Sequence, residues 1–143
     1  MRQQGSISFI GQVERIEGSI SRIKIKTEFC EGLNKIDSFS HLIIIGWFHL
    51  KDSKKDRQTI NVVPKRHPGA PEIGVFASRS PNRPNPIAIS TVELLGIEGC
   101  TVLVKGLDFM EETPIVDIKP YLPRADKIVD VKTPAWTTKG PPS

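Results

Sequence analysis

The chain has 143 residues, of which 38% are hydrophobic and 25% are charged, a composition typical of a globular protein of one-domain size. No apolar stretch approaches the roughly 20 residues that a membrane-spanning helix requires, so we expect a cytoplasmic protein without membrane contact. The formal net charge is +4, and between Lys51 and Arg83 eight Lys or Arg residues stand against three Asp or Glu residues. If these loops share one face, they attract phosphate; the alternative is a pair of solvated loops.

Strand patterns predominate along the chain. The expected strands cover residues 6–16, 22–27, 41–50, 60–63, 73–78, 87–99, 100–109 and 113–121. Strict alternation around Ile23 and Ile25 predicts that both face a core, whereas the wholly apolar run 41–50 predicts a strand buried on both faces. Between these strands, residues 28–40 predict one short helix or turn.

Many short strands, with Gly and Pro turns and no long helices between them, indicate the fold class. They predict a mainly β protein, a small closed or nearly closed antiparallel β-barrel with short helices and long loops. We expect this domain to cover residues 1–130 and a C-terminal tail to cover residues 131–143, with Trp136 as the only large anchor of the tail. No strand–GxGxxG–helix unit is present, so any nucleotide-like cofactor is not held in the Rossmann manner.

The octapeptide RSPNRPNP, residues 79–86, is the most distinctive stretch. Proline has no N–H and fixes φ near −65°, so we expect a stiff, polyproline-like loop between two strands. The three-residue repeat of such a loop places Pro81 and Pro84 on one edge, against a core. It also separates Arg79 and Arg83 by about 12 Å, which suits two anions, or one anion and one stacked ring. The alternative is that each arginine ties the loop to backbone carbonyl groups.

Other polar candidates are scattered along the chain. His49 ends an apolar strand, where its ring either emerges at a barrel mouth or is a hydrogen-bonded structural group. Asp117 lies within an apolar strand and needs a partner, either Lys119 or a loop arginine, unless it acts directly in a site. The histidines form no metal-ligand pattern. Cys30 and Cys100 have no metal or redox spacing and are interpreted as small buried apolar residues.

Three blocks of sequence resemble those of one family. GVFASRSPNRPNPIAIS (residues 74–90) is similar to the signature of the TsaA-like family, whose characterised members, called TrmO, are tRNA methyltransferases. SFSHLIIIGWFHL (residues 38–50) and TPIVDIKPYLPRAD (residues 113–126) resemble its other two blocks, in the same order. The resemblance implies a small β-barrel, usually a homodimer, that binds S-adenosylmethionine without a Rossmann domain. It also implies methyl transfer to N6 of threonylcarbamoyl-adenosine beside the anticodon of threonine tRNA.

The resemblance also implies which residues form the site. Its cofactor site would use His49, Arg79, Ile89, Glu112, Thr113 and Pro114. On the substrate side we place Arg83, Asn85 and Asp117. No metal ligand is expected, and no residue is assigned as the general base that takes a proton from the acceptor nitrogen.

The chain departs from the family pattern in two places. Where the family commonly has DGTP, this chain has EETP, so Glu112 stands at a glycine position. The PRQ-type segment after the first strand, which contributes to the family's cofactor pocket, is missing from GQVERIEGSISRIKIKT. Two alternatives therefore remain beside tRNA methylation. One is a non-catalytic barrel that binds S-adenosylmethionine or RNA, and the other is a methyltransferase with a different acceptor.

Overall fold

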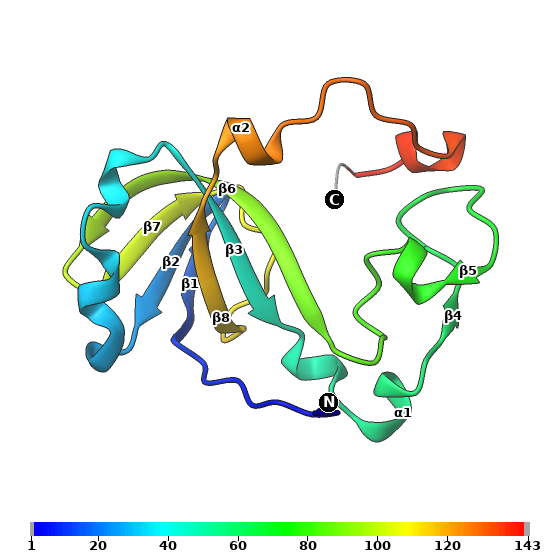
Figure 1. Ribbon diagram of the computed structural model, residues 1–143, viewed down its shortest axis with the longest axis horizontal. Coiled ribbons are helices and arrows are strands. Elements are labelled where there is room, and N and C mark those ends of the chain that lie inside the picture. The colour runs from blue at the N-terminus through cyan, green and yellow to red at the C-terminus, as the bar shows by residue number, and fades with distance from the viewer. Residues whose placement is uncertain (1, 142–143) are drawn as a thin grey trace. The chain divides into compact units, whose positions relative to one another are not determined.

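The computed structural model describes residues 2–141 and consists mainly of β-strands (Figure 1). The strands are β1 (Gly11–Glu17), β2 (Ile20–Ile25), β3 (His41–Trp47), β4 (Asn61–Val62), β5 (Ile73–Gly74), β6 (Ile87–Glu98), β7 (Thr101–Lys105) and β8 (Pro114–Pro120). Six of them close into a barrel in the order β1-β2-β7-β6-β3-β8, and β4 pairs with β5 in a separate sheet. The predicted mainly β fold with a small closed barrel is confirmed.

The chain divides into two compact units. Unit 1 comprises Met1–Trp47 and Ile89–Tyr121, and unit 2 comprises Phe48–Ala88 and Leu122–Ser143. Unit 1 contains most of the barrel, together with the short helices η1 (Thr27–Leu33) and η2 (Ile36–Ser38). The helices of unit 2 are η3 (His49–Lys51), α1 (Lys54–Arg57), η4 (Val75–Ala77), α2 (Pro123–Asp126) and η5 (Ala135–Thr138). Within residues 2–141, no helix has the length and apolar character needed to span a membrane.

The barrel interior follows from the two-residue period of its strands. Ile23 and Ile25 of β2 are buried as the alternation predicts, and they share the core with inward residues of β7 and β3. The expectation that residues 41–50 are buried on both faces is wrong. In β3 only every second residue is fully buried, and Ile43 and Ile45 between them are half-exposed, because a barrel has one inner face and its outer face is only partly covered.

A register shift in β3 brings a glycine against an aromatic ring. Ile45 pairs with Asp117 of β8, but the next residue, Gly46, pairs with Ile115, which marks a bulge. A Cβ atom on Gly46 would lie 2.6 Å from the ring of Phe109. The glycine is therefore required by close packing.

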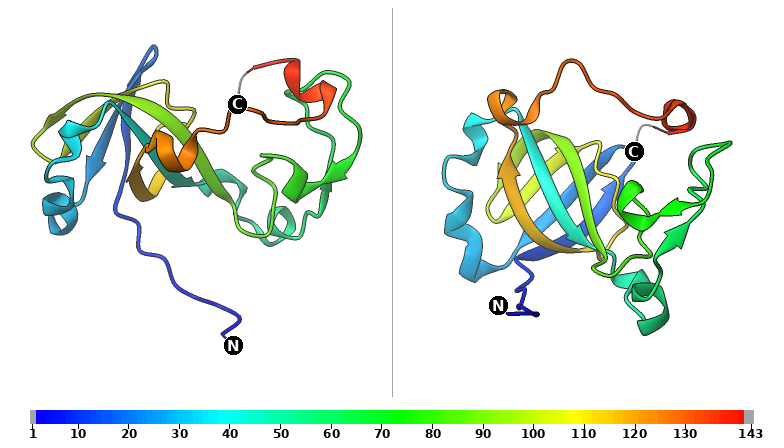
Figure 2. Two further views of the ribbon diagram at one scale, coloured as in Figure 1. Left: turned by 45° about the horizontal axis from the view of Figure 1, so that its top comes forward. Right: turned by 45° about the vertical axis from the view of Figure 1, so that its right-hand side comes forward.

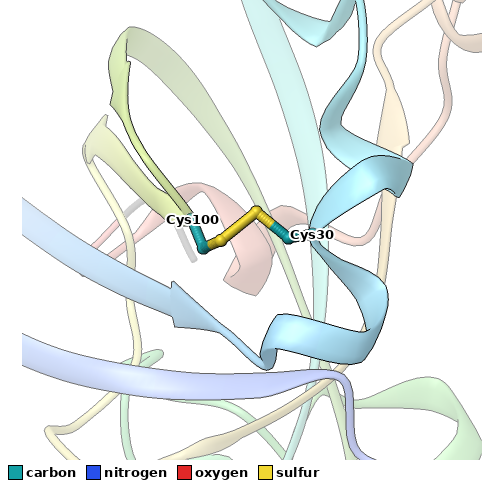
Figure 3. Close-up of a disulfide and its surroundings, with 2 residues drawn as sticks. All are labelled: Cys30 and Cys100. Carbon is teal, nitrogen blue, oxygen red and sulfur yellow. A yellow bond between two sulfur atoms is a disulfide. The ribbon is translucent and has the colours of Figure 1, made fainter.

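A disulfide joins Cys30 of η1 to Cys100 in the β6–β7 turn (Figure 3). The expectation of two small buried thiols is wrong, because the two cysteines are bonded to each other. They are 70 residues apart in sequence, so their pairing becomes visible only in the folded chain. The Ile25 N–H donates to the Cys100 carbonyl over 2.9 Å, which places the end of β2 beside that turn. Helix η1 follows directly, and where one short helix or turn was expected in residues 28–40 the structure has two short helices, η1 and η2.

Unit 2 is built from short elements and loops. The expected strands 60–63 and 73–78 are present only as the two-residue pair β4 and β5, and Val75–Ala77 forms the short helix η4 instead. Helix α1 begins after Ser53, whose Oγ accepts the Asp56 N–H over 3.1 Å and donates to the Asp56 carboxylate over 2.7 Å. This N-cap contact favours a helix of four residues in a charged loop.

Candidate functional site

The proline loop, residues 79–86, lies outside helices and strands, as predicted, but it is bent rather than straight. The Ser80 N–H donates to Ser78 Oγ, and the Asn82 N–H donates to Ser80 Oγ, each over 3.3 Å. These serine turns bend the chain, so the predicted three-residue repeat fails. The buried proline is Pro86, at the start of β6.

The two arginines of the proline loop differ in their contacts. Arg83 Nη1 donates to the Ser78 carbonyl over 3.0 Å and to the Ser80 carbonyl over 3.1 Å, so the structural alternative holds for this nitrogen. Arg79 is exposed and forms no hydrogen bond or ion pair with any residue between 2 and 141. The loop therefore uses one arginine to hold its own shape and presents the other to solvent.

Asn82 lies between these arginines, and the sequence analysis assigned it no role. Its Oδ1 atom is buried and has no hydrogen-bond partner among the described residues. A buried acceptor without a donor is costly, and such atoms in native structures call for a water, an ion or a ligand. The loop thus offers an unused cation at Arg79 and an unused acceptor at Asn82.

Arg57 of α1 is a second residue that sequence reasoning missed. Its Nε donates to the Pro84 carbonyl over 2.9 Å, its Nη2 donates to Asn85 Oδ1 over 3.3 Å, and its Nη1 pairs with Asp52 Oδ1 over 3.3 Å. Arg57 therefore fixes the C-terminal part of the proline loop from 27 residues away along the chain. The capping pattern of α1 predicts a helix, but no local signal predicts this contact.

His49 is half-buried at the start of η3, two residues after β3 ends. The preceding Phe48 N–H donates to the Pro86 carbonyl over 2.7 Å. Within unit 2 the structure therefore brings the chain at His49 to the end of the proline loop. Of the predicted residues, His49, Arg79, Arg83 and Asn85 belong to this unit.

Unit 1 holds the turn Glu112-Thr113-Pro114. Glu112 has a φ of 70°, the left-handed region that favours glycine, which matches the glycine of the family pattern. The Glu112 N–H donates to the Val13 carbonyl over 2.7 Å, and the Thr113 N–H donates to the Met110 carbonyl over 3.2 Å. Both N–H groups are thus already bonded, and Thr113 is buried, so a ligand can use the Glu112 carbonyl but neither N–H.

Ile89 and Asp117 are the other predicted residues of unit 1. Ile89 lies on the outer side of β6 and is 51% exposed, like Ile87 two residues before it at 42%. Asp117 of β8 accepts the Ile118 N–H over 2.9 Å and pairs with Lys119 over 3.1 Å. Lys119 is therefore its partner, one of the two options expected from sequence. Asp117 also lines a cavity of about 350 Å³ beside η1.

The two units differ strongly in charge. Unit 2 contains twelve Lys or Arg and five Asp or Glu residues, a formal charge of +7. Unit 1 contains eight Lys or Arg and eleven Asp or Glu residues, a formal charge of −3. The net charge of +4 thus hides a basic unit that carries Arg57, Arg79 and Arg83. No group of three or more His, Cys, Asp or Glu side chains that suits a metal ion occurs among residues 2–141.

Comparison with known proteins agrees with this fold and these motifs. The chain is 44% identical over 110 residues to the "Probable S-adenosyl-L-methionine-binding protein" of Archaeoglobus fulgidus, covering 77% of this chain and 28% of the relative. It is 39% identical over 104 residues to the tRNA (adenine(37)-N6)-methyltransferase of Escherichia coli, covering 70% of this chain and 43% of that enzyme. The chain thus spans less than half the length of either curated relative.

A solved structure described as the crystal structure of TrmO superposes with a TM-score of 0.72 at 28% identity. The match covers 92% of this chain and 64% of that one. A family model described as the tRNA-methyltransferase O N-terminal domain matches residues 11–127, which include all three sequence blocks in full. The chain belongs to the family of the tRNA-methyltransferase O N-terminal domain.

Proposed function

We propose that the chain is an S-adenosylmethionine-dependent methyltransferase that acts on tRNA. The proposed acceptor is N6 of threonylcarbamoyl-adenosine next to the anticodon, as the resemblance implies. The activity in the name of the Escherichia coli relative and the ligand in the name of the Archaeoglobus fulgidus relative support this proposal. The basic character of unit 2 supports an RNA substrate, because Lys and Arg side chains supply most of the affinity for a phosphate backbone.

One observation carries the cofactor part of the proposal: the proline loop presents the exposed cation of Arg79, which has no partner among residues 2–141. The methionine end of S-adenosylmethionine bears a carboxylate and an ammonium group. Arg79 suits the carboxylate, since a guanidinium binds carboxylates in a bidentate way. Prolines and the Arg83 and Arg57 contacts fix the loop beforehand, which lowers the entropy lost on binding.

For the remaining parts of the cofactor we propose the residues of unit 1 that the resemblance implies. The exposed Ile89 side chain offers an apolar surface for the adenine ring, and the Glu112 carbonyl offers an acceptor for its amino group. Thr113 and Pro114 hold the turn in place, and His49 is proposed as a further contact from unit 2. When bound, the cofactor supplies an electrophilic methyl group on a sulfonium. The residues of this chain bind, orient and exclude water, which are the main requirements for such a displacement.

Arg83, Asn85 and Asp117 are proposed on the substrate side. Arg83 uses Nη1 for its own loop, and Nε and Nη2 have no partner among residues 2–141, so they remain for a phosphate. Asn85 accepts from Arg57 through Oδ1, which leaves its amide N–H groups as donors. Asp117 is engaged by Lys119, so its role depends on exchange of that exposed ion pair.

Two measurements test the proposal. Calorimetry should show binding of S-adenosylmethionine, with a loss of roughly 10- to 150-fold in affinity for Arg79→Ala, since one charge-assisted contact contributes about 1.5 to 3 kcal/mol. A methylation assay on threonylcarbamoylated tRNA should show turnover, and unmodified tRNA is the matched control.

A binding module without catalysis is the second candidate function. It is favoured by the missing PRQ-type segment and by the name of the Archaeoglobus fulgidus relative, which states binding only. Binding of the cofactor without turnover on any tRNA would establish this alternative. Turnover on another acceptor would retain the methyltransferase and discard the tRNA substrate.

A homodimer in the cytoplasm completes the proposal. The dimer comes from the resemblance, and analytical ultracentrifugation measures it directly. The Cys30–Cys100 disulfide bears on the cytoplasmic location, because structural disulfides in cytoplasmic proteins are common chiefly in hyperthermophiles.

A further inference from the structure

The C-terminal segment of the described chain is fastened to a loop of the same unit. The rings of Trp136 and His67 lie edge to face with centroids 5.5 Å apart. His67 Nδ1 lies 2.7 Å from the Lys139 carbonyl, and since a carbonyl only accepts, the imidazole Nδ1–H is the donor. Figure 2 shows η5 beside the loop between β4 and β5. The segment is therefore held by specific polar and aromatic contacts.

A glycine makes the closest part of this contact. Gly140 has a φ of 89°, and a Cβ atom on it would overlap the Arg66 carbonyl oxygen. Both the backbone angle and the close approach suit only glycine. The contact therefore brings Lys139 and Arg66, the neighbours of Gly140 and His67 in sequence, to one place. We call the residues of this contact, 64–68 and 134–140, the clasp.

The clasp contains cations and no acidic residue. Its charged side chains are Lys65, Arg66 and Lys139, within a unit whose formal charge is +7. Lys65 and Lys139 are exposed. Cations gathered around aromatic rings form the typical footprint of a protein surface that binds nucleic acid. The family match ends at residue 127, so the C-terminal half of the clasp is not part of the matched domain.

We propose that the clasp binds the phosphate backbone of tRNA, adding affinity without reading sequence. This inference rests on the proposed function, because it takes the tRNA as the partner. The positive charge of the clasp favours a polyanion as its ligand. The Trp136–His67 ring contact and the His67–Lys139 hydrogen bond hold Lys139 near Lys65, so that both lysines can bind phosphates of one RNA strand. In this proposal the C-terminal segment contributes to RNA binding.

The test compares two pairs of lysine replacements in the whole chain. Lys65→Gln with Lys139→Gln removes two charges from the clasp, and Lys24→Gln with Lys105→Gln removes two exposed charges from unit 1 as the matched control. The probe is an unmodified tRNA transcript, titrated at several salt concentrations. The clasp variant should bind about tenfold more weakly at 0.1 M salt, with a slope of log K against log salt reduced by about 2. The control should change affinity by less than about twofold.

A third variant tests whether the contact itself matters. Trp136→Ala keeps every charge but releases the segment, so it should raise hydrogen exchange in residues 64–70 and weaken tRNA binding, while leaving S-adenosylmethionine affinity unchanged. If the parent binds tRNA and the clasp variant binds with equal affinity and slope, the inference is overturned and the proposed function stands. If the parent does not bind tRNA even at low salt, the proposed function fails and the inference fails with it.

Discussion

The disulfide between Cys30 and Cys100 should contribute a large part of the stability of this fold. It closes a loop of 70 residues, and the restriction of the unfolded chain by a loop of that length corresponds to about 4 kcal/mol at 25 °C. Domains of this size are stable by about 5 to 15 kcal/mol in total. Replacing both cysteines by serine should therefore lower the free energy of unfolding by up to about 4 kcal/mol.

The assay is urea unfolding followed by tryptophan fluorescence, with and without reductant. The reduced parent and the Cys30→Ser, Cys100→Ser variant should share one lowered midpoint, and the reductant should not shift the midpoint of the variant. Thiol alkylation and mass measurement verify that the bond is present before reduction and broken after it. An unchanged midpoint in a parent whose bond is verified as broken would refute the entropic argument.

The loss should also be uneven along the chain. Helices η1 and η2, between β2 and β3, have no buried residue, so few apolar contacts hold this segment to the barrel. Hydrogen exchange in residues 27–38 should therefore rise more on reduction than exchange in β7, whose Val102 and Val104 are fully buried. Equal protection of both segments after reduction would show that packing, and not the disulfide, retains the helices.

Three further substitutions test individual contacts. Arg57→Ala should weaken S-adenosylmethionine binding roughly fivefold in calorimetry, because Arg57 holds the loop that carries the proposed cofactor contacts. The magnitude follows from about 1 kcal/mol for such a hydrogen bond. Unchanged affinity would mean that the loop keeps its shape without Arg57. Gly46→Ala should cost about 1 to 3 kcal/mol in thermal unfolding through its clash with Phe109, whereas Gly96→Ala, with open space around it, is the milder control. Glu112→Gly should stabilise the chain by roughly 0.5 kcal/mol, because the left-handed penalty of about 1 kcal/mol exceeds the added entropy of a glycine; a lower melting temperature would contradict this.

Local sequence patterns predicted the strands because each strand of a barrel has one face toward the core and one face away from it. Ile23 and Ile25 alternate with charged residues since only one side of β2 faces the core. The same rule explains why the prediction for residues 41–50 was wrong. These residues are apolar on both faces of the strand, but a barrel strand has no second layer that buries its outer face. Proline chemistry likewise predicted a loop at residues 79–86, but the serine hydrogen bonds that bend it depend on spacing that the prolines do not reveal.

Contacts between distant parts of the sequence could not be predicted. Arg57 is one cation in a charged run, and nothing nearby indicates that it binds Pro84 and Asn85. Asn82 looks like any loop amide until folding buries its Oδ1 atom without a donor. The resemblance identified Glu112 as a departure from the family's glycine, and the structure supplies the reason for that glycine, a φ of 70°.

Because the charge is uneven between the two units, the salt dependence of binding differs between a tRNA acceptor and a small-molecule acceptor. Exposed charges are screened beyond about 8 to 10 Å in physiological salt, so a long polyanion meets the local charge of the surface it contacts, and not the net +4. A tRNA on the basic unit releases one counterion for each phosphate that is neutralised, whereas a small acceptor releases almost none. The salt dependence of substrate binding therefore distinguishes tRNA from a small-molecule acceptor even where both are methylated, and the affinity for S-adenosylmethionine, a small ligand, serves as the internal reference in the same titration.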